Sequence, residues 1–306
     1  MKLALGYIPF LWPADKVRAF YLEMAEQPLD IIYLGEAVCS KRRAIGTGEW
    51  IELGRQLAGA GKQAVLSSLA LIEAKSELAN AKRLCENGEL MVEANDMAAV
   101  QMMHERGMPF VTGNGINIYN AHSLRILFEK GLRRWVFPVE LSALCLQELL
   151  AEARDMGIAG QLETEVLAYG HLGLAYSARC FTARAHDLPK DQCGFVCKDY
   201  PAGMALSTQE DQQLFILNGI QVMSGDLCNL LGEVEGMRQM GVDVLRLNPT
   251  GGDMRPIIDQ FRAAADGLAP TALLKGATDL PQGVNGYWHG RPGMNHSLPW
   301  EDTLAE

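Results

Sequence analysis

Short apolar runs alternate with amphipathic stretches along most of this 306-residue chain. Eight of the runs predict strands, and several of these are β-branched and nearly continuous, which is the pattern of strands buried on both faces. The predicted strands are residues 2–9, 31–34, 63–67, 90–93, 110–112, 135–137, 162–167 and 244–247.

The stretches between these runs carry apolar residues at helical spacing. In residues 15–27, for example, Val17, Tyr21 and Met24 fall on one helical stripe. Several of these stretches end at Gly or Asn, a common helix stop, and Ser142 is a suitable N-cap. The other predicted helices are residues 48–61, 72–87, 96–106, 121–130 and 142–156.

Eight strands alternating with helices over ~250 residues predict an α/β fold, a (β/α)8 TIM-barrel-like single domain. A doubly wound open sheet is the alternative, since periodicity alone does not separate the two. We expect residues 1–268 to form the barrel domain, and the tail 269–306 to pack on or near it.

The regular spacing is interrupted once, after the seventh strand. About 75 residues separate Leu167 from Val244, far more than a usual connection. We therefore expect an insertion over residues 168–243. It contains three cysteines and a second apolar stretch, residues 213–224, which predicts an additional pair of strands.

Composition narrows the range of partners and compartments. The net charge of −10 argues against nucleic acid or an anionic membrane as a partner. The densest basic run, Lys41-Arg42-Arg43, is interpreted as a solvated surface turn.

No apolar run approaches the ~20 residues of a membrane span, and the N-terminus shows no cleavage site, so we expect a cytoplasmic protein. In the cytoplasm thiols stay reduced. Seven cysteines, an odd number, also fit poorly with a disulfide framework.

Polar residues stand at the ends of several predicted strands, where a barrel collects its chemistry. Glu36, Glu93 and Arg246 are the candidate catalytic residues for a small polar substrate. Each could instead cap a helix or form a structural ion pair. The loop Gly113-Asn114-Gly115 is interpreted as a turn first and an anion cradle second, because it lacks a third glycine.

Four cysteines form the candidate metal site. Cys180, Cys193 and Cys197 lie in the insertion, and Cys39 follows the second strand on the same predicted barrel face. Four thiolates suit zinc or an iron–sulfur cluster. Structural zinc sites usually have two short cysteine pairs, whereas only Cys193 and Cys197 are closely spaced here. The spacing therefore favours a cluster and leaves zinc open.

The other cysteines and one histidine have simpler interpretations. A reactive pair of His171 with Cys180 is conceivable, but we expect His171 to pack or to support the metal site. The remaining cysteines fall in apolar helical patterns and are interpreted as small buried hydrophobic residues: Cys85, Cys145 and Cys228.

Two segments carry a family resemblance. Residues 165–180, EVLAYGHLGLAYSARC, resemble the signature of the collagenase-like peptidase family of unassigned mechanism. Residues 32–43, IYLGEAVCSKRR, more particularly resemble the branch of that family that serves bacterial ubiquinone biosynthesis. The match extends through residues 217–221, LNGIQ, and covers nearly the whole chain.

The resemblance implies a [4Fe–4S] cluster held by Cys39, Cys180, Cys193 and Cys197. It also implies a heterodimer with a UbiU-like paralogue that hydroxylates ubiquinone precursors without molecular oxygen. Prephenate would be the hydroxyl donor, and a UbiT-like lipid-binding protein an accessory. Many family members carry a cysteine where this chain has Gly173, and we expect Cys39 to supply that ligand instead.

Two other activities occur in the same family, peptidase and RNA hydroxylation. No set of nucleophile, base and orienting residue can be assembled from this sequence, which disfavours a peptidase. The acidic net charge disfavours an RNA-hydroxylation factor.

Overall fold

The computed structural model describes residues 1–268 and 283–297, and its centre is a closed barrel of eight parallel strands. Closure depends on one pairing: the sixth strand hydrogen-bonds to the seventh, so the sheet has no open edge between them. This confirms the predicted barrel and excludes the open sheet. The barrel strands are β1 (Lys2–Leu5), β2 (Ile31–Leu34), β3 (Gln63–Ser67), β4 (Met91–Ala94), β5 (Phe110–Thr112), β6 (Leu132–Val136), β7 (Glu163–Gly170) and β13 (Val244–Leu247).

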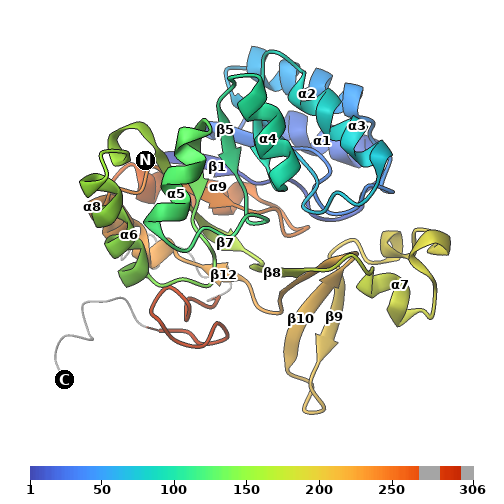
Figure 1. The fold of residues 1–306 in the computed structure, drawn as a ribbon. Coiled ribbons are helices and arrows are strands. Elements are labelled where there is room, and N and C mark those ends of the chain that lie inside the picture. The colour runs from blue at the N-terminus through green and yellow to red at the C-terminus, as the bar shows by residue number, and fades with distance from the viewer. Residues whose placement is uncertain (269–282, 298–306) are drawn as a thin grey trace.

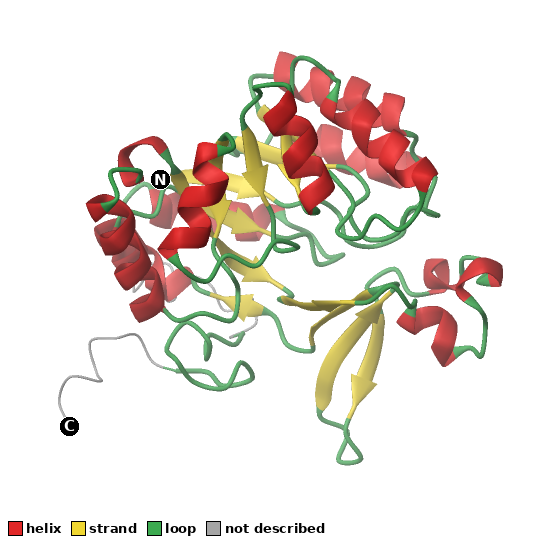
Figure 2. Cartoon of the chain, in the orientation of Figure 1, coloured by secondary structure: helices red, strands yellow, loops and turns green. Residues whose placement is uncertain are grey.

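Helices follow the strands and surround the barrel (Figures 1 and 2). Side chains cap three of them: Asp96, Asn120 and Ser142 each accept a backbone N–H from the first turn of the helix that follows. The long helices are α1 (Ala14–Ala25), α2 (Thr47–Gly59), α3 (Lys75–Cys85), α4 (Met97–Glu105), α5 (Ala121–Glu129), α6 (Ala143–Asp155) and α9 (Arg255–Ala265). None in the described part of the chain is long and apolar enough to cross a membrane.

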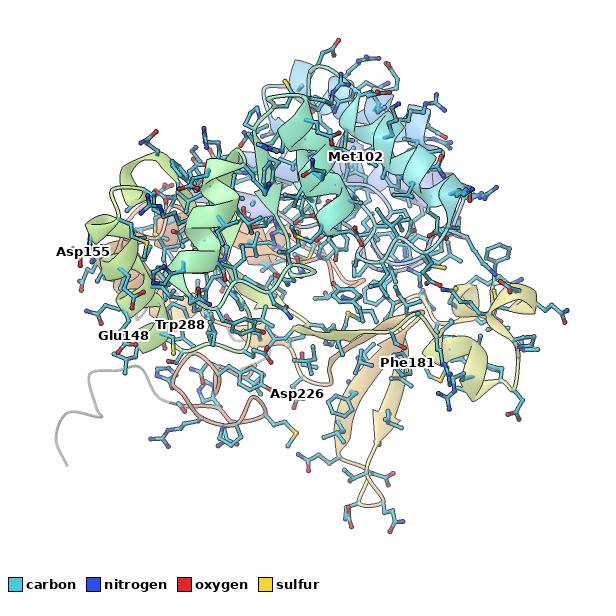
Figure 3. All side chains as sticks on the ribbon, in the orientation of Figure 1. Met102, Glu148, Asp155, Phe181, Asp226 and Trp288 are labelled. Atoms are coloured by element: carbon cyan, nitrogen blue, oxygen red, sulfur yellow. The ribbon has the colours of Figure 1, made fainter. Side chains whose placement is uncertain are left out.

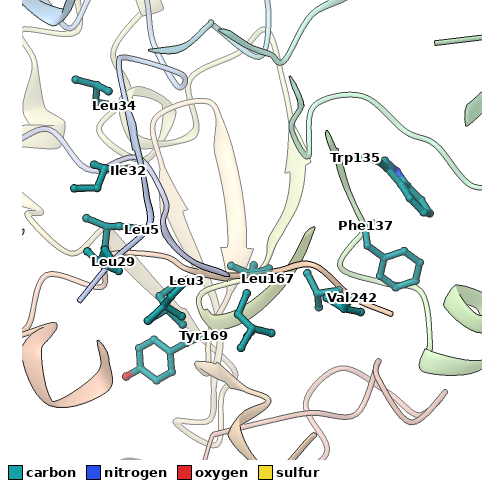
Figure 4. Packing of buried hydrophobic residues seen from close by; sticks show 14 of the residues in the cluster. Leu3, Leu5, Leu29, Ile32, Leu34, Trp135, Phe137, Leu167, Tyr169 and Val242 are labelled. Atoms are coloured by element: carbon teal, nitrogen blue, oxygen red, sulfur yellow. The ribbon is translucent and has the colours of Figure 1, made fainter. Parts of the chain in front are cut away.

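Alternate strand residues face the barrel interior and the helices. On β2, Ile31 and Tyr33 belong to the small cluster inside the barrel, while Ile32 and Leu34 belong to the larger cluster between strands and helices. Figure 4 shows part of the larger cluster, in which residues of several strands lie close together. Burial on both faces explains why the strands read as continuous apolar runs.

The insertion after β7 forms a second, antiparallel sheet in the order β8-β11-β10-β9. The predicted strand pair in residues 213–224 corresponds to β10 and β11. The sheet and α7 lie on one side of the barrel, away from α5 and α6 (Figure 1). The elements are β8 (Gly173–Tyr176), α7 (Phe181–Ala185), three-residue η2 (Lys190–Gln192), η3 (Val196–Asp199), β9 (Met204–Ser207), β10 (Gln213–Asn218) and β11 (Gln221–Ser224).

The chain returns to the barrel through β12 (Cys228–Asn229), an extra strand antiparallel to β7, then η4 (Leu231–Glu233) and α8 (Val234–Met240). Residues 283–297 lie against this region: Val284 bridges to Cys228. The carbonyl of Trp288 accepts the N–H of Ala143, which places Trp288 beside α6 (Figure 3). The rest of the tail predicted to pack on the barrel, residues 269–282 and 298–306, lies outside the described residues.

Candidate metal site and barrel face

Four free thiols line one small cavity. Cys39 comes from the loop after β2, Cys180 is the N-cap of α7, Cys193 follows η2, and Cys197 lies in η3. The space between them is about 20 Å³, room for about one water molecule. Cys39 therefore meets the insertion in space, although it lies far upstream in the sequence.

The loop that carries Cys39 is held by a carboxylate. Glu36 Oε1 accepts the backbone N–H groups of Val38 and Cys39, each at 3.0 Å, and the carbonyl of Cys39 accepts the N–H of Arg42 at 3.0 Å. Burial raises the pKa of Glu36, while Arg42 and the two N–H groups act in the opposite direction. The candidate catalytic residue Glu36 thus positions a cysteine.

Lys41 joins this loop to the insertion, and Lys190 joins the insertion to the loop after β3. Lys41 Nζ donates to the carbonyl of Lys190 at 2.8 Å and to the carboxylate of Asp191. Lys190 Nζ donates in turn to the carbonyl of Ala178 at 2.8 Å and to Glu73. These contacts bring the segment before Cys193 next to the loop after β2.

Arg42 is buried, with 4% of its surface exposed. Its guanidinium donates to the carbonyl of Pro9 and to Asn218 Oδ1, both at 2.7 Å, and its Nε has no partner. Asn218 Nδ2 donates to the same Pro9 carbonyl at 2.7 Å. The interpretation of Lys41-Arg42-Arg43 as a solvated turn is therefore wrong for Arg42, which links the barrel to the inserted sheet. Arg42 stands three residues after Cys39 in the sequence, and this short spacing is the feature that could have placed Arg42 beside the thiol cavity.

Gly219 closes the other side of the cavity, in the two-residue turn between β10 and β11. Its φ of +64° suits glycine, and a Cβ there would lie 3.1 Å from Arg42 Nη2. Its N–H donates to Thr182 Oγ1 at 3.0 Å, and its carbonyl accepts the N–H of Phe181 at 2.7 Å. Phe181, at the start of α7, is labelled in Figure 3. The tight turn thus fixes the helix that Cys180 caps.

The chemistry of this lining fits a group that binds several thiolates. Lys41, Arg42 and Lys190 line the same cavity, and their positive charges favour thiolate ligands. Burial raises the pKa of the Cys39 and Cys197 thiols, and Arg42 opposes this in both. As placed, no three His, Cys, Asp or Glu side chains in the described residues form a group that could hold a metal ion.

The other two candidate catalytic residues meet inside the barrel. Arg246 Nη1 donates to Glu93 Oε1 at 2.7 Å, its Nε donates to Glu165, and its guanidinium lies 3.8 Å from the ring centroid of Tyr33. All four side chains are buried. Burial lowers the pKa of Arg246, but Glu165 and Glu93 outweigh it and raise that pKa. Glu36 contacts Arg42 and not this group, so the structure pairs Glu93 with Arg246 and separates both from Glu36.

The inserted strand β8 crosses the C-terminal face of the barrel near this ion network. The hydroxyls of Tyr176 on β8 and Tyr7 after β1 are 3.5 Å apart, and Gln221 Nε2 donates to Tyr176 at 3.2 Å. Burial raises the pKa of both tyrosines. Arg246 Nη2 remains without a hydrogen-bond partner.

A separate cavity of about 260 Å³ lies at the barrel face beside Tyr176, Asn114 and Glu140. Gly173 lines this cavity and not the thiol cavity. The loop at Asn114 is tightly packed: a Cβ on Gly115 would lie 2.3 Å from the carbonyl oxygen of Asn95. Close packing therefore accounts for the glycine there.

His171 and the other cysteines take no part in the thiol cavity. His171 Nδ1 is 2.8 Å from the carbonyl oxygen of Ser224, so its ring is engaged away from Cys180. Cys85 and Cys228 are buried, as expected, whereas Cys145 is half-buried and contacts Ser142.

Comparison with known protein families shows which family this chain belongs to. The model of peptidase family U32 matches residues 15–269. This chain belongs to peptidase family U32. The resemblance seen in residues 165–180 is thereby confirmed at the level of the family.

Solved structures with similar folds have low sequence identity to this U32 chain. The U32 peptidase Mk0906 is 9% identical, with a TM-score of 0.44 over 82% of this chain and 94% of that one. An uncharacterized B. cereus protein is 9% identical, with a TM-score of 0.46 over 87% of this chain and 64% of that one. Thiamine phosphate pyrophosphorylase from Pyrococcus furiosus is 13% identical, with a TM-score of 0.46 over 87% and 96%.

Proposed function

We propose that this U32 chain is a UbiV-like protein: the [4Fe–4S]-binding subunit of a heterodimeric, O2-independent hydroxylase of anaerobic ubiquinone biosynthesis, in the cytoplasm. Prephenate would supply the hydroxyl group. Membership in family U32 and the motif in residues 32–43 support this proposal. The single observation that carries it is the convergence of four free thiols on one cation-lined cavity.

A cluster explains that convergence better than disulfides or isolated thiols. The cluster, when bound, can transfer electrons singly, and thiolates from Cys39, Cys180, Cys193 and Cys197 would hold it. A four-iron cluster takes one thiolate per iron and needs more room than a single ion. As placed, the thiols enclose about 20 Å³.

The chain's own residues have defined roles in this proposal. Glu36 orients the loop of Cys39 through two N–H groups. Lys41 joins that loop to the segment carrying Cys193, and Lys190 ties the same segment to the carbonyl of Ala178. Arg42 provides a buried positive charge that offsets the thiolates.

The proposed partners are a UbiU-like paralogue, a UbiT-like lipid-binding protein, and ubiquinone precursors. They follow from the motif resemblance. A peptidase remains the alternative because of the family name, but no serine hydroxyl or cysteine thiol among the described residues hydrogen-bonds to a histidine, and the His171 ring is bound to the carbonyl of Ser224. RNA hydroxylation is opposed by the net charge of −10.

Anaerobic purification with measurement of iron, sulfide and zinc tests the proposal. We expect about four irons per chain, a brown colour and thiolate-to-iron absorbance. Cys39→Ala, Cys180→Ala, Cys193→Ala and Cys197→Ala should each lose the cluster and fail to support anaerobic ubiquinone synthesis. Cys145→Ala, a half-buried cysteine away from the cavity, should keep both.

Co-purification with the paralogue under the same conditions tests the heterodimer. Stoichiometric zinc without iron would contradict the cluster. A cluster-free variant that still complemented a deletion strain would show that the cluster is dispensable for the pathway.

A further inference from the structure

A second cavity, of about 510 Å³, lies next to the thiol cavity, between the loops that follow β2 and β3 and the helices α2 and α3. Three arginines line it, Arg42, Arg43 and Arg83, against one carboxylate, Glu36. Arg42 lines both cavities, so the two share a wall. Such an excess of positive charge is unusual in a chain whose net charge is −10.

Several of these polar groups have no partner within the protein. Arg43 and Arg83 make neither an ion pair nor a hydrogen bond through their side chains in the described residues. The Oγ of Ser67, a fully buried residue that lines the cavity, has no hydrogen-bond partner. Burying a hydroxyl without a hydrogen-bond partner destabilises the fold, so the position of Ser67 calls for a ligand or bound water.

The one carboxylate in the lining is already engaged. Glu36 accepts hydrogen bonds from Val38 and Cys39 and lies 4.0 Å from Arg42 Nη1. It therefore does not neutralise Arg43 or Arg83.

The start of α2 adds positive potential. Gly46 and Thr47 line the cavity, and Gly46 has no side chain to cap the 13-residue helix. A Cβ on Gly48 would lie 2.9 Å from Arg83 Nη2, so that guanidinium lies against the first turn of α2. Helix N-termini and arginine guanidinium groups both bind oxyanions.

Part of the remaining wall is apolar. Trp50, Leu69 and Leu84 line it, and Trp50 and Leu84 are otherwise buried. The volume lies within the roughly 300–1,000 Å³ typical of small-molecule sites, which combine apolar walls with a few placed polar groups.

We propose that this cavity binds a small organic acid: one carboxylate or phosphate group on an apolar body. Arg43, Arg83 and the N-terminus of α2 bind the acidic group, Ser67 donates a hydrogen bond, and Trp50 packs against the body. The shared wall at Arg42 places the ligand beside the thiol cavity. The site does not depend on a bound cluster, because its groups come from α2, α3 and the two loops.

Calorimetric titration of the full-length, anaerobically purified protein tests the site with four probes. Benzoate and phenyl phosphate should bind, and neutral benzamide should not. Inorganic phosphate separates an anion site that needs no organic body from the proposed one: it should bind at least tenfold more weakly than phenyl phosphate. Binding should weaken as salt is raised.

Matched variants locate the site. Arg43→Gln and Arg83→Gln should each weaken binding of benzoate or phenyl phosphate at least tenfold. Arg154→Gln is the control. Arg154 is an exposed arginine in the last turn of α6, and Arg83 is an exposed arginine in the last turn of α3. Arg43 and Arg83 are both exposed, so a melting curve should show that the two variants fold.

Three results would overturn the proposal: no binding of either acid, equal binding of benzamide, or unchanged affinity in Arg43→Gln and Arg83→Gln. Iron content measured on the same samples distinguishes failure of the acid-binding site from failure of the cluster proposal. Iron-free protein that binds acids through Arg83 would retain the site and lose the proposed hydroxylase.

Discussion

Glu36 holds the loop of one cysteine of the thiol cavity, although Glu36 is not itself one of the proposed cluster ligands. Its carboxylate accepts two backbone N–H groups in the loop that ends at Cys39. Its place at a strand end suggested chemistry from the sequence, but the same place also suits a residue that fixes a loop. The structure supports the second role.

Glu36→Ala removes the acceptor for both N–H groups and should lower the free energy of unfolding by about 1–3 kcal/mol. It should also lower iron content after anaerobic purification. Urea denaturation and iron analysis measure the two effects. Glu36→Gln keeps an acceptor oxygen and should retain more iron; equal iron in wild type and Glu36→Ala would contradict this role.

Arg246 is the centre of a buried ion network inside the barrel. It pairs with Glu93 and Glu165, and the three side chains are at most 3% exposed. We therefore expect the main contribution of Arg246, on β13, to be to the stability of the fold.

Arg246→Met leaves two buried carboxylates without their cation, which should cost roughly 3–5 kcal/mol in the free energy of unfolding. Urea denaturation measures the loss. Arg154→Met, on the surface of α6, should change stability by no more than about 0.5 kcal/mol. If Arg246→Met lost activity while keeping wild-type stability, a catalytic role would be favoured over this one.

At the scale of elements, the barrel strands were predictable and most of the inserted sheet was not. Strands β2, β3, β5 and β13 have the predicted bounds, because burial on both faces leaves continuous apolar runs. Of the inserted sheet, only β10 and β11 were expected. β9 is only four residues long and is exposed over most of its length, so it lacks the longer apolar run of a buried strand.

A buried polar junction at the end of β10 helps to tie the inserted sheet to the barrel. Asn218, at the end of β10, bonds to both Arg42 and the carbonyl of Pro9. Trp12 Nε1 adds a bond to the carbonyl of Pro201 at 2.9 Å. Since Cys180, Cys193 and Cys197 all lie in the insertion, this junction controls their approach to Cys39.

Asn218→Ala should loosen that junction, at a cost of about 1–3 kcal/mol, because buried Arg42 and Pro9 lose partners. Hydrogen exchange should rise in residues 204–224 and stay unchanged in α5 and α6. Gln209→Ala, an exposed position within the same insertion, is the control. Faster exchange spread evenly over the whole chain would show that the insertion does not open independently.

At the scale of the molecule, charged side chains join strands where the barrel closes. Glu163 on β7 accepts from Lys2 on β1 and from Arg134 on β6. Burial opposes ionisation of Glu163, but these two cations outweigh it and lower its pKa. A carboxylate with a lowered pKa stabilises the folded state above its unfolded pKa, and that contribution is lost as pH falls through the folded pKa.

Glu163→Gln should therefore be less stable than wild type at pH 7, by about 1 kcal/mol because the pair with Lys2 is largely exposed. The difference should shrink as the pH falls below about 4, near the ordinary pKa of glutamate. Urea denaturation of both proteins at several pH values measures it. A difference that stayed constant into acid would contradict an ionic origin.

The sequence by itself determined the strand and helix pattern, the α/β class, the position of the insertion and the identity of four candidate ligands. Each of these depends on local periodicity or on residue type. Only the tertiary structure decided that β6 pairs with β7 to close the barrel, that Arg42 is buried, and that Glu36 is separate from Glu93 and Arg246. Those facts depend on which distant segments meet, and periodicity, which describes neighbours along the chain, holds no information about such contacts.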